Sequence, residues 1–454
     1  MTDAAQTETD VIVIGLGPGG EHVAIKLAEG GLDVIGIEER LVGGECPYYG
    51  CVPSKMMIAA AHTLRETHRV NDLAGTATAT PDWAPVAKRI RDEATDDWND
   101  QVAVDRLVEA GARFVRGRGT IVGPGRVQVG DTTYVARKGI VLNPGTEPTA
   151  PPVDGLADTP YWTNREAVQL TELPSSLAVI GGGAVGCELA QVMALFGVRV
   201  TLLEVAPRLV ALEEPEASEV LEKSFAQTGI QVLTGVEIAA VSYADGAFRL
   251  DLGDQEVSAE KLLVAAGRRN NLAGLGLEHV GLDPEAKQLE PDERMRVADG
   301  VWAIGDVTGH GAFTHVSMYQ GAVAVRDLLG EDGPWADYRA VARVTFTAPE
   351  VASVGMSEEA AGKAGLEVAV ATGDLGARGW IAREDGLIKL VADADRGVLV
   401  GGCVVGPAGG EIMSMLEVAV HAEVPVTTLL GMHFAYPTYH RAIETVLKDL
   451  VQQL

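Results

Sequence analysis

The chain has 454 residues, of which 64 are acidic and 36 basic, so its formal net charge is −28 at pH 7. This charge disfavours nucleic acid and anionic membrane surfaces as partners, because both are themselves negative. The composition, with 47% hydrophobic and 22% charged residues, is that of a globular protein, and its length predicts two to four domains.

The sequence predicts neither secretion nor a membrane span. Residues 1–10 are polar and lack a basic segment followed by an apolar run, so we expect no secretion signal. No stretch of about 18 or more apolar residues occurs. Four cysteines in a chain of this length do not make a disulfide scaffold. These features favour the cytoplasm, where a disulfide is more often catalytic than structural.

The first predicted element is a strand, residues 10–14, that ends in a glycine-rich turn before a helix at 21–27. Three glycines fit the pattern G-x-G-x-x-G: Gly15, Gly17 and Gly20. They permit a tight turn, and the N–H groups at the helix N-terminus then face the pyrophosphate of a dinucleotide. Residues 34–37 predict the next strand, and Glu38 at its end is placed to accept ribose hydroxyls. This context predicts a dinucleotide-binding unit.

Residues 43–55, directly after this unit, contain two of the four cysteines, Cys46 and Cys51, at the predicted start of a helix. Two thiols at this spacing form a disulfide only with specific local geometry. No second Cys or His pair with zinc spacing follows, so we predict no metal site. Beside a glycine-rich fingerprint, we interpret the two cysteines as a redox pair rather than as buried structural residues.

The following region is less regular. Residues 86–110 predict a helix from their apolar spacing, and Gly111 is a natural end for it. Short β-like runs broken by glycine occupy residues 114–134, and a strand at 139–142 enters a turn-rich crossover. Several prolines in that crossover predict a domain boundary near residues 150–157.

The fingerprint then returns. A strand at 177–180 precedes a second glycine-rich turn, an apolar helix at 187–196, and a strand at 198–203 that ends in Glu204. The three glycines of this second fingerprint are Gly181, Gly183 and Gly186. The chain therefore carries a second predicted dinucleotide-binding unit.

The two units have the same spacing: Gly15 to Glu38 and Gly181 to Glu204 are both 23 residues. Two units imply two nucleotides, and for an enzyme the simplest arrangement is one bound permanently and one exchanging. Glu204 can bind a free 2′-hydroxyl but would repel a 2′-phosphate, which favours NADH over NADPH. Arg208 is close in sequence and could partly restore phosphate binding, so NADPH stays an alternative.

Two later strands end in chemically informative residues. Residues 261–266 lead into Gly267, and residues 301–304 lead into Gly305 and Asp306. An Asp at a strand end beside a nucleotide crevice can bind sugar hydroxyls; the alternative is an Asp that begins a turn. From about residue 337 the chain alternates strands and ends in two helices, which predicts a separate α+β domain.

Over essentially its whole length the chain resembles the flavoprotein pyridine nucleotide–disulfide oxidoreductases, a family that includes glutathione reductase, dihydrolipoamide dehydrogenase, mycothione reductase and mercuric reductase. The matching motifs are the two fingerprints, the run at 43–55, Gly267-Arg268-Arg269-Asn270, Ala303-Ile304-Gly305-Asp306 and residues 346–355. The resemblance implies an α/β fold with two Rossmann-like domains: FAD-binding parts at 1–155 and 271–336, and an NAD(P)-binding domain at 156–270. It assigns residues 337–454 to a dimerisation domain, and hence a homodimer.

The resemblance also implies roles for individual residues. FAD would bind the first unit, with Glu38 on its adenosine ribose and Asp306 on its ribityl chain. Hydride would pass from NAD(P)H in the second unit to FAD, and electrons then to the Cys46–Cys51 disulfide. Cys51 would be the thiolate beside the flavin, and Cys46 the outer interchange thiol.

Further positions follow from the same resemblance. Lys55 would lie near the flavin ring and pair with Glu188, where a cation stabilises the negative charge of the reduced flavin. Three glycines would complete the cofactor-binding positions: Gly44, Gly145 and Gly267.

One departure affects acid–base chemistry. The family's C-terminal His-Pro-Thr and the Glu after it form a pair that acts from the other subunit. Here Tyr436 stands in place of the His and Arg441 in place of the Glu. A tyrosine, with a free pKa of about 10, is a poor base near neutral pH, which argues against efficient reduction of an ordinary disulfide. A Tyr at this position resembles mercuric reductase and the soluble transhydrogenases.

Three functions are compatible with these features. The first is an NADH-dependent flavoprotein reductase that passes electrons through Cys46 and Cys51 to a small-molecule acceptor: a disulfide, a metal ion or another thiol-reactive compound. The second is a quinone reductase or diaphorase-type enzyme that reduces its acceptor directly from the flavin. The third is a redox-sensing flavoprotein without turnover. We favour the first.

Overall fold

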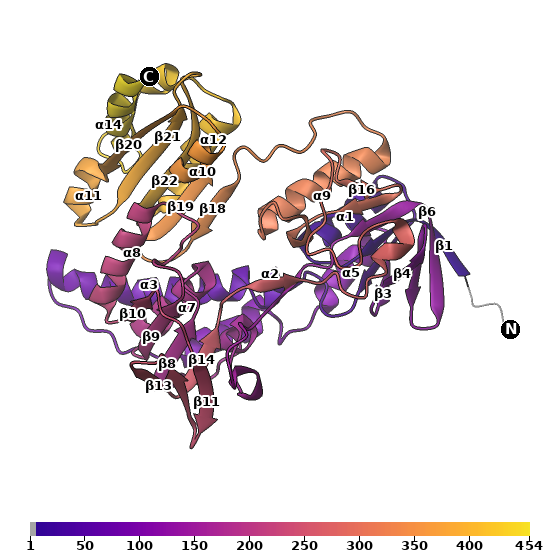
Figure 1. Ribbon diagram of the computed structural model, residues 1–454, viewed down its shortest axis with the longest axis horizontal. Helices are drawn as coiled ribbons and strands as arrows, with labels where there is room; N and C mark the ends of the chain where they lie inside the picture. Colours follow the sequence, from indigo (N-terminus) through magenta and orange to yellow (C-terminus); the bar gives the residue numbers. More distant parts are fainter. Residues whose placement is uncertain (1–5) are drawn as a thin grey trace. The chain divides into compact units, whose positions relative to one another are not determined.

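A computed structural model describes residues 6–454 (Figure 1). They form two compact units, each built from three segments of the chain. Unit 1 contains the residues up to 53, 88–148 and 268–337, and unit 2 contains 54–87, 149–267 and 338–454. The chain passes between the units within α3 (Cys51–Leu73) and again within α4 (Ala84–Arg89). The finer division expected from the sequence, with borders at 155, 270 and 336, stays a prediction.

Unit 1 is built on an eight-stranded mixed sheet. Its strands are β1 (Gln6–Ile14), β2 (Val34–Glu38), β3 (Arg113–Arg116), β4 (Thr120–Gly123), β5 (Arg126–Val129), β6 (Thr132–Leu142), β16 (Arg296–Ala298) and β17 (Val301–Ala303). The order β16–β17–β6–β1–β2–β3 runs across it, and all neighbours from β17 to β3 are parallel. Strands β4 and β5 form a hairpin that joins β6. A central strand of this kind is covered on both faces, which explains why residues 11–14 are almost fully buried.

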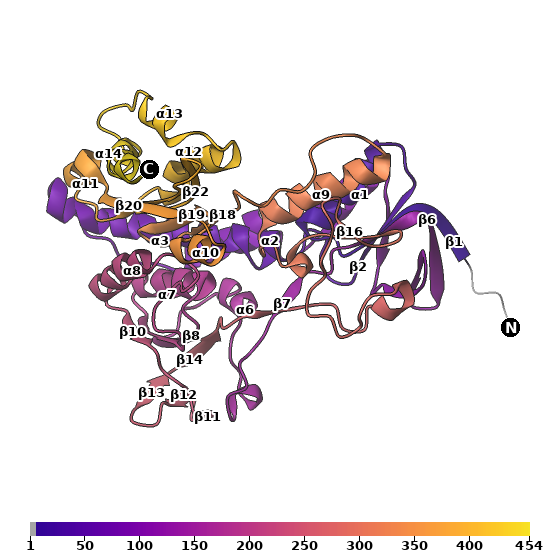
Figure 2. The same ribbon diagram turned by 45° about the horizontal axis from the view of Figure 1, so that its top comes forward.

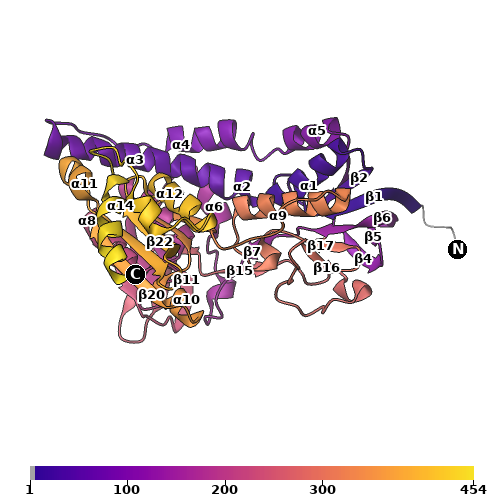
Figure 3. The ribbon, with the colours of Figure 1, turned by 90° about the horizontal axis from the view of Figure 1, so that it is seen from above.

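Helices α1 (Pro18–Glu29) and α9 (Thr314–Leu329) lie side by side in unit 1 (Figure 3). They approach closely because a glycine faces a small residue: a Cβ on Gly19 would lie 2.1 Å from the Ser317 hydroxyl oxygen. The remaining elements of unit 1 are short: α2 (Glu45–Tyr48), α5 (Gln101–Glu109), the 3₁₀ turns η3 (Leu277–Val280) and η4 (Asp306–Thr308), and the two-stranded ribbon of β7 (Thr146–Pro148) and β15 (Arg268–Asn270).

The continuous helix predicted over residues 86–110 is wrong. Helix α4 leads into a π-helical turn, η1 (Ile90–Ala94), and residues 95–100, three of them with left-handed backbone angles, separate that turn from α5. The Thr95 hydroxyl donates hydrogen bonds to the carbonyls of Ile90 and Arg91. Such a bond weakens a helix only slightly, and the chain leaves the helical path at Asp96, Asp97 and Trp98, whose φ angles are positive.

The first part of unit 2 contains a four-stranded parallel sheet in the order β10–β9–β8–β14. Its strands are β8 (Ser176–Ile180), β9 (Arg199–Glu204), β10 (Gln231–Thr234) and β14 (Lys261–Val264). Helices α7 (Ala184–Leu195) and α8 (Pro215–Thr228) lie beside it (Figure 2). The other elements of this part are η2 (Leu156–Asp158), α6 (Asn164–Val168) and an antiparallel sheet of β11 (Ala240–Ala244), β12 (Ala247–Asp251) and β13 (Glu256–Ala259).

The C-terminal part of unit 2 is an antiparallel five-stranded sheet in the order β18–β19–β22–β21–β20. The strands are β18 (Ala342–Thr345), β19 (Glu350–Gly355), β20 (Val368–Asp374), β21 (Leu387–Asp393) and β22 (Val398–Gly406). The helices are α10 (Glu358–Lys363), α11 (Gly376–Ala382), α12 (Gly409–His421), α13 (Val426–Leu430) and α14 (Arg441–Leu450), followed by η5 (Val451–Gln453). The expected α+β domain is present.

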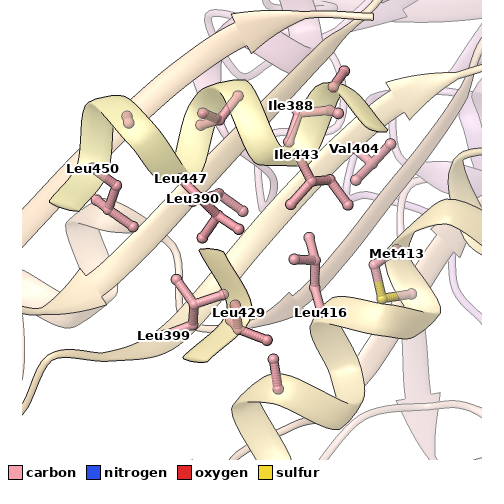
Figure 4. Close-up of a cluster of buried hydrophobic side chains, with 14 of the residues drawn as sticks. Ile388, Leu390, Leu399, Val404, Met413, Leu416, Leu429, Ile443, Leu447 and Leu450 are labelled. Atoms are coloured by element: carbon pink, nitrogen blue, oxygen red, sulfur yellow. The ribbon is translucent and has the colours of Figure 1, made fainter. Parts of the chain in front are cut away.

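This C-terminal part has its own hydrophobic core (Figure 4). Ile443, Leu447 and Leu450 recur at helical spacing along α14, and all three are fully buried. They pack against apolar residues of the sheet and of α12 and α13. None of the helices between residues 6 and 454 has the length and apolar run needed to cross a membrane.

Candidate functional site

The glycine turn of unit 1 lies at the end of the central strand. The Gly15 amide donates to the Ile37 carbonyl at 2.9 Å, and the Asn143 amide donates to the Ile14 carbonyl at 2.8 Å. The strand end is therefore flanked by β2 on one side and β6 on the other, the topological switch point where dinucleotides bind in such sheets. A side chain is excluded at the last glycine, because a Cβ on Gly20 would lie 2.0 Å from the Gly15 carbonyl oxygen.

The helix after this turn has no side-chain cap at its N-terminus. Gly17 is the N-cap of α1 and provides no capping side chain, whereas the short helix α6 is capped by the Thr163 hydroxyl. A helix N-terminus without a side-chain cap suits a phosphate, which accepts N–H groups and is attracted by the helix dipole. The residues present thus fit the pyrophosphate of FAD.

Glu38 closes this site at the end of β2. Its carboxylate accepts hydrogen bonds from the Leu16 amide at 2.8 Å and the Arg40 amide at 2.7 Å. Burial raises the pKa of Glu38, and the two amides oppose that effect. The carboxylate is thereby fixed beside the turn, as a ribose-binding group requires.

Unit 2 repeats this geometry. The Gly181 amide donates to the Leu203 carbonyl at 2.8 Å, and a Cβ on Gly186 would lie 1.9 Å from the Gly181 carbonyl oxygen. Gly183 is the N-cap of α7, again without a capping side chain. Glu204 accepts from the Gly182 amide at 2.5 Å and from the Ala206 amide at 2.7 Å. The two fingerprints are therefore alike in hydrogen bonding as well as in sequence.

Arg208 is held by its own loop. Its guanidinium donates to the Ser218 hydroxyl at 2.9 Å and to the Ala211 carbonyl at 2.7 Å. These bonds tie the guanidinium to α8 and to the loop before it, so the structure gives no support to Arg208 as a 2′-phosphate ligand.

Asp306 is linked to two other side chains of unit 1 by hydrogen bonds. Its carboxylate accepts from the Thr146 hydroxyl at 2.6 Å, and that hydroxyl accepts from the Arg268 Nε at 2.7 Å. Gly145, with φ of 65°, precedes Thr146 and forms the turn into β7. Gly267, with φ of 147°, directly precedes Arg268, the first residue of β15, just as Gly145 precedes the first residue of β7.

The structure contains Cys46 and Cys51 as a pair of thiols. Cys46 lies in α2, and Cys51 is the first residue of the 23-residue helix α3. A hydrogen bond with Cys51, and next burial, raise the pKa of Cys46. The backbone before them turns at Gly44, where φ is 67° and a Cβ would lie 2.8 Å from the Gly17 Cα. The thiol pair and the glycine turn are thus held together within unit 1.

Thr314 is a residue that the sequence did not reveal. Its hydroxyl lies 3.5 Å from the Cys51 sulfur, and its hydrogen bond with Cys46 partly offsets the rise in the pKa of that thiol. It is the first residue of α9, 263 positions after Cys51. Nothing in the local sequence indicates this contact.

Lys55 and Glu188 form an ion pair in unit 2, with 2.8 Å between Nζ and Oε2. The Glu188 side chain is 6% exposed, and its other oxygen accepts from the Phe346 amide at 2.8 Å. The Lys55 ammonium also lies 4.6 Å from the centre of the Phe346 ring, a cation–π distance. A buried carboxylate thus fixes the position of this lysine.

Tyr436 lies in the loop before α14 and is 72% exposed. The Arg441 guanidinium carbon lies 6.0 Å from the centre of its ring, and Arg441 itself pairs with Glu444 at 2.7 Å. His440 packs against Phe434, with 5.9 Å between ring centres. Across the described chain, 6–454, no group of three or more His, Cys, Asp or Glu side chains is arranged to hold a metal ion.

Comparisons with known proteins agree with this geometry. Residues 9–321 match the family described as pyridine nucleotide-disulphide oxidoreductase, and residues 341–447 match its dimerisation domain. The chain is 32% identical to a dihydrolipoyl dehydrogenase of Chlorobaculum tepidum, with 100% of this chain and 99% of the relative covered. It is 34% identical to a mercuric reductase of Streptomyces lividans, with 97% of this chain and 96% of that relative covered. The crystal structure of LpdA from Mycobacterium tuberculosis is similar with a TM-score of 0.85 at 26% identity, covering 98% of this chain and 99% of that one.

Proposed function

Because this chain belongs to the pyridine nucleotide-disulphide oxidoreductase family, we propose that it is an NADH-dependent reductase that passes electrons through Cys46 and Cys51 to a thiol-reactive acceptor. FAD and NAD(P)H are the cofactors of this family. One observation carries the proposal: the thiol of Cys46, in the short helix α2, is hydrogen-bonded to the thiol of Cys51, the first residue of the long helix α3. That is the arrangement a pair needs to alternate between dithiol and disulfide.

The residues of the two fingerprints would hold the cofactors. In unit 1 the turn at Gly15, Gly17 and Gly20 and the carboxylates of Glu38 and Asp306 would bind FAD, whose chemistry is to accept hydride from the nicotinamide and pass two electrons on. In unit 2 the turn at 181–186 and Glu204 would bind NADH. The Glu204 side chain is fixed at the strand end, and Arg208 is held by Ser218, which favours NADH over NADPH.

The two thiols differ in environment, which assigns them different roles. Cys51 begins α3, where the helix dipole stabilises a thiolate, and the Thr314 hydroxyl lies beside its sulfur. The hydrogen bond with Cys51, and next burial, raise the pKa of Cys46. We therefore assign Cys51 as the resident thiolate and Cys46 as the thiol that meets the acceptor.

The acid–base groups expected near the two thiols limit the kinds of acceptor that the protein can reduce. Reduction of a disulfide by Cys46 requires removal of its proton, and the residue in the family's base position, Tyr436, is a poor base near neutral pH. A soft metal ion needs no such base, because binding to the metal itself releases the thiol proton. We propose soft metal ions and strongly electrophilic compounds as acceptors ahead of ordinary disulfides.

We also propose a homodimer, since residues 341–447 match the family's dimerisation domain. Tyr436 lies at the end of that segment and is largely exposed. In the dimer it would act from the C-terminal part of one subunit on the thiols of the other. An active monomer would contradict this assembly.

An anaerobic titration of the FAD-loaded protein with NADH tests the proposal. The expected result is a broad long-wavelength band after two electrons, the sign of a thiolate beside oxidised flavin. Simple bleaching of the flavin would show that the cysteines do not take the electrons. The variant Cys46→Ser should lose reduction of metal ions and disulfides, whereas Cys403→Ser, which alters a cysteine buried in β22, should retain it. Full acceptor reduction by Cys46→Ser would instead identify direct transfer from the flavin, as in a quinone reductase.

A further inference from the structure

A strained segment of unit 1, residues 96–98, contacts the segment that carries the two cysteines, residues 42–51, which we call the redox loop. Three consecutive residues adopt left-handed backbone angles, with φ of 47° at Asp96, 55° at Asp97 and 58° at Trp98. They follow directly on the π-helical turn η1 and on Thr95. Residues with a Cβ avoid this region, a bulky one such as Trp above all, so surrounding contacts must hold the segment in place.

The contact at the end of this segment reaches the chain between the two cysteines. The Trp98 indole Nε1 donates to the Tyr48 carbonyl at 3.2 Å. Tyr48 is the last residue of α2, a helix of four residues. The final carbonyls of a helix have no partner within it, so the indole satisfies a backbone group that the short helix leaves open.

The same segment also holds the chain before the cysteines. The Asp100 carboxylate accepts from the Val42 amide at 2.7 Å, and it forms an ion pair with Arg116 at 2.5 Å. Val42 precedes the Gly43-Gly44 turn, and Tyr48 lies between Cys46 and Cys51. Residues 95–100 thus fix the redox loop at two points, one upstream of the first cysteine and one between the pair.

We propose that Trp98 is a positioning residue that sets the equilibrium between the dithiol and disulfide forms of Cys46 and Cys51. This inference rests on the redox function proposed above. Forming the disulfide joins two sulfurs of one loop, so its equilibrium depends on the effective concentration of one thiol at the other. A loop held at Tyr48 keeps the sulfurs close, whereas a released loop lets them separate and favours the dithiol.

The exchange can be followed with glutathione as the redox partner. Oxidised glutathione takes two electrons and two protons from the pair and becomes two glutathione thiols, while an S–S bond forms between Cys46 and Cys51. The full-length protein with FAD is equilibrated anaerobically at a series of glutathione ratios and then alkylated. Mass spectrometry of the peptide containing both cysteines gives the oxidised fraction.

Trp98→Phe removes the indole N–H and keeps an aromatic ring. We expect the equilibrium constant for disulfide formation to fall by up to about tenfold, the limit reached when the disulfide form depends on the whole of this hydrogen bond and the dithiol form on none of it. Tenfold corresponds to about 30 mV for a two-electron couple. Trp83→Phe is the matched control. It removes an indole–carbonyl hydrogen bond of 2.8 Å, to Leu170 in unit 2, and should leave the equilibrium unchanged.

The outcomes separate the two proposals. A wild-type pair that neither glutathione nor NADH can cycle would overturn the redox function itself. A wild-type pair that titrates, with Trp98→Phe equal to Trp83→Phe, would overturn the positioning role alone. If Trp98→Phe gives no folded flavoprotein, Trp98→Tyr also removes the indole N–H to the Tyr48 carbonyl and is measured in the same way; an unchanged equilibrium there would also refute the inference.

Discussion

Glu204 offers the sharpest test of cofactor choice. Its two oxygens accept from the Gly182 and Ala206 amides at 2.5 and 2.7 Å, so the carboxylate is fixed at the end of β9. Glu204→Gln removes the charge while it keeps the size and one acceptor oxygen. Because both oxygens accept from backbone amides, the amide nitrogen of Gln must face one of these donors, so the variant loses one hydrogen bond as well as the charge.

The expected magnitude follows from Coulomb's law. Two unit charges about 5 Å apart interact by roughly 3 kcal/mol at an effective dielectric constant of about 20, and by under about 1 kcal/mol in bulk water. Glu204 is partly buried, so its repulsion of a 2′-phosphate falls between these limits, at about 1–2 kcal/mol. Removing it should shift the ratio of kcat/KM for NADH and NADPH about 5- to 30-fold toward NADPH.

The assay is steady-state kinetics with each nucleotide and one common acceptor that takes electrons from the flavin. Glu38→Gln is the matched control, because Glu38 has the same two backbone donors in the first fingerprint. That change should weaken FAD binding and leave the nucleotide ratio unchanged. Wild-type protein that uses NADPH as well as NADH, or a ratio unaffected by Glu204→Gln, would refute the electrostatic argument.

Three further predictions follow from other parts of the structure. Lys389 is 2% exposed and paired with three carboxylates. Changing it to Met should lower the free energy of unfolding by about 3–5 kcal/mol, because a buried carboxylate loses its partner. Glu358→Gln, at the exposed edge of that cluster, should lower the free energy measured by thermal unfolding by under about 1 kcal/mol. Since the pKa of Cys46 is raised, the rate of its alkylation in the NADH-reduced protein should increase only above the pH range of ordinary thiols. Cys51→Ser should move this pH dependence of the alkylation rate to lower pH. The same pH dependence in both proteins would contradict the prediction. Gel filtration should remove NADH but retain FAD, and loss of both at equal rates would contradict the assignment of a permanent and an exchanging nucleotide.

The fingerprints could be predicted from the sequence because their chemistry is local. Glycine positions, the acid at the next strand end and the cysteine spacing all fall within short windows. The sequence predicted Glu38 and Glu204 as ribose-binding acids, but not the hydrogen bonds that they accept from their own turns. The family resemblance supplied the Lys55–Glu188 contact, which joins residues 133 positions apart.

Contacts between distant segments could not be predicted in this way. Thr314 meets Cys51 only because α9 begins beside the redox loop, and Trp98 meets Tyr48 only because the predicted helix is broken. At that break the Thr95 hydroxyl binds two carbonyls of the preceding turn, and the next three residues have positive φ angles. Apolar spacing carries no signal for such a break, so the periodicity alone predicted one continuous helix.

The two glycine-rich turns have the same pattern of hydrogen bonds, but the segments around them differ. This difference fits the binding of two different cofactors. In unit 1 the chain folds back over the glycine turn: the Gly43 amide donates to the Leu16 carbonyl at 2.7 Å, and Gly44 packs on Gly17. In unit 2 the loop after Glu204 leaves Val205 71% and Leu212 88% exposed. A nucleotide bound as proposed at the first turn would lie beside the segment that carries the two cysteines, whereas one at the second turn would lie beside an exposed loop. Because a segment folded over the turn slows release, the first site suits a resident flavin and the second an exchanging NADH.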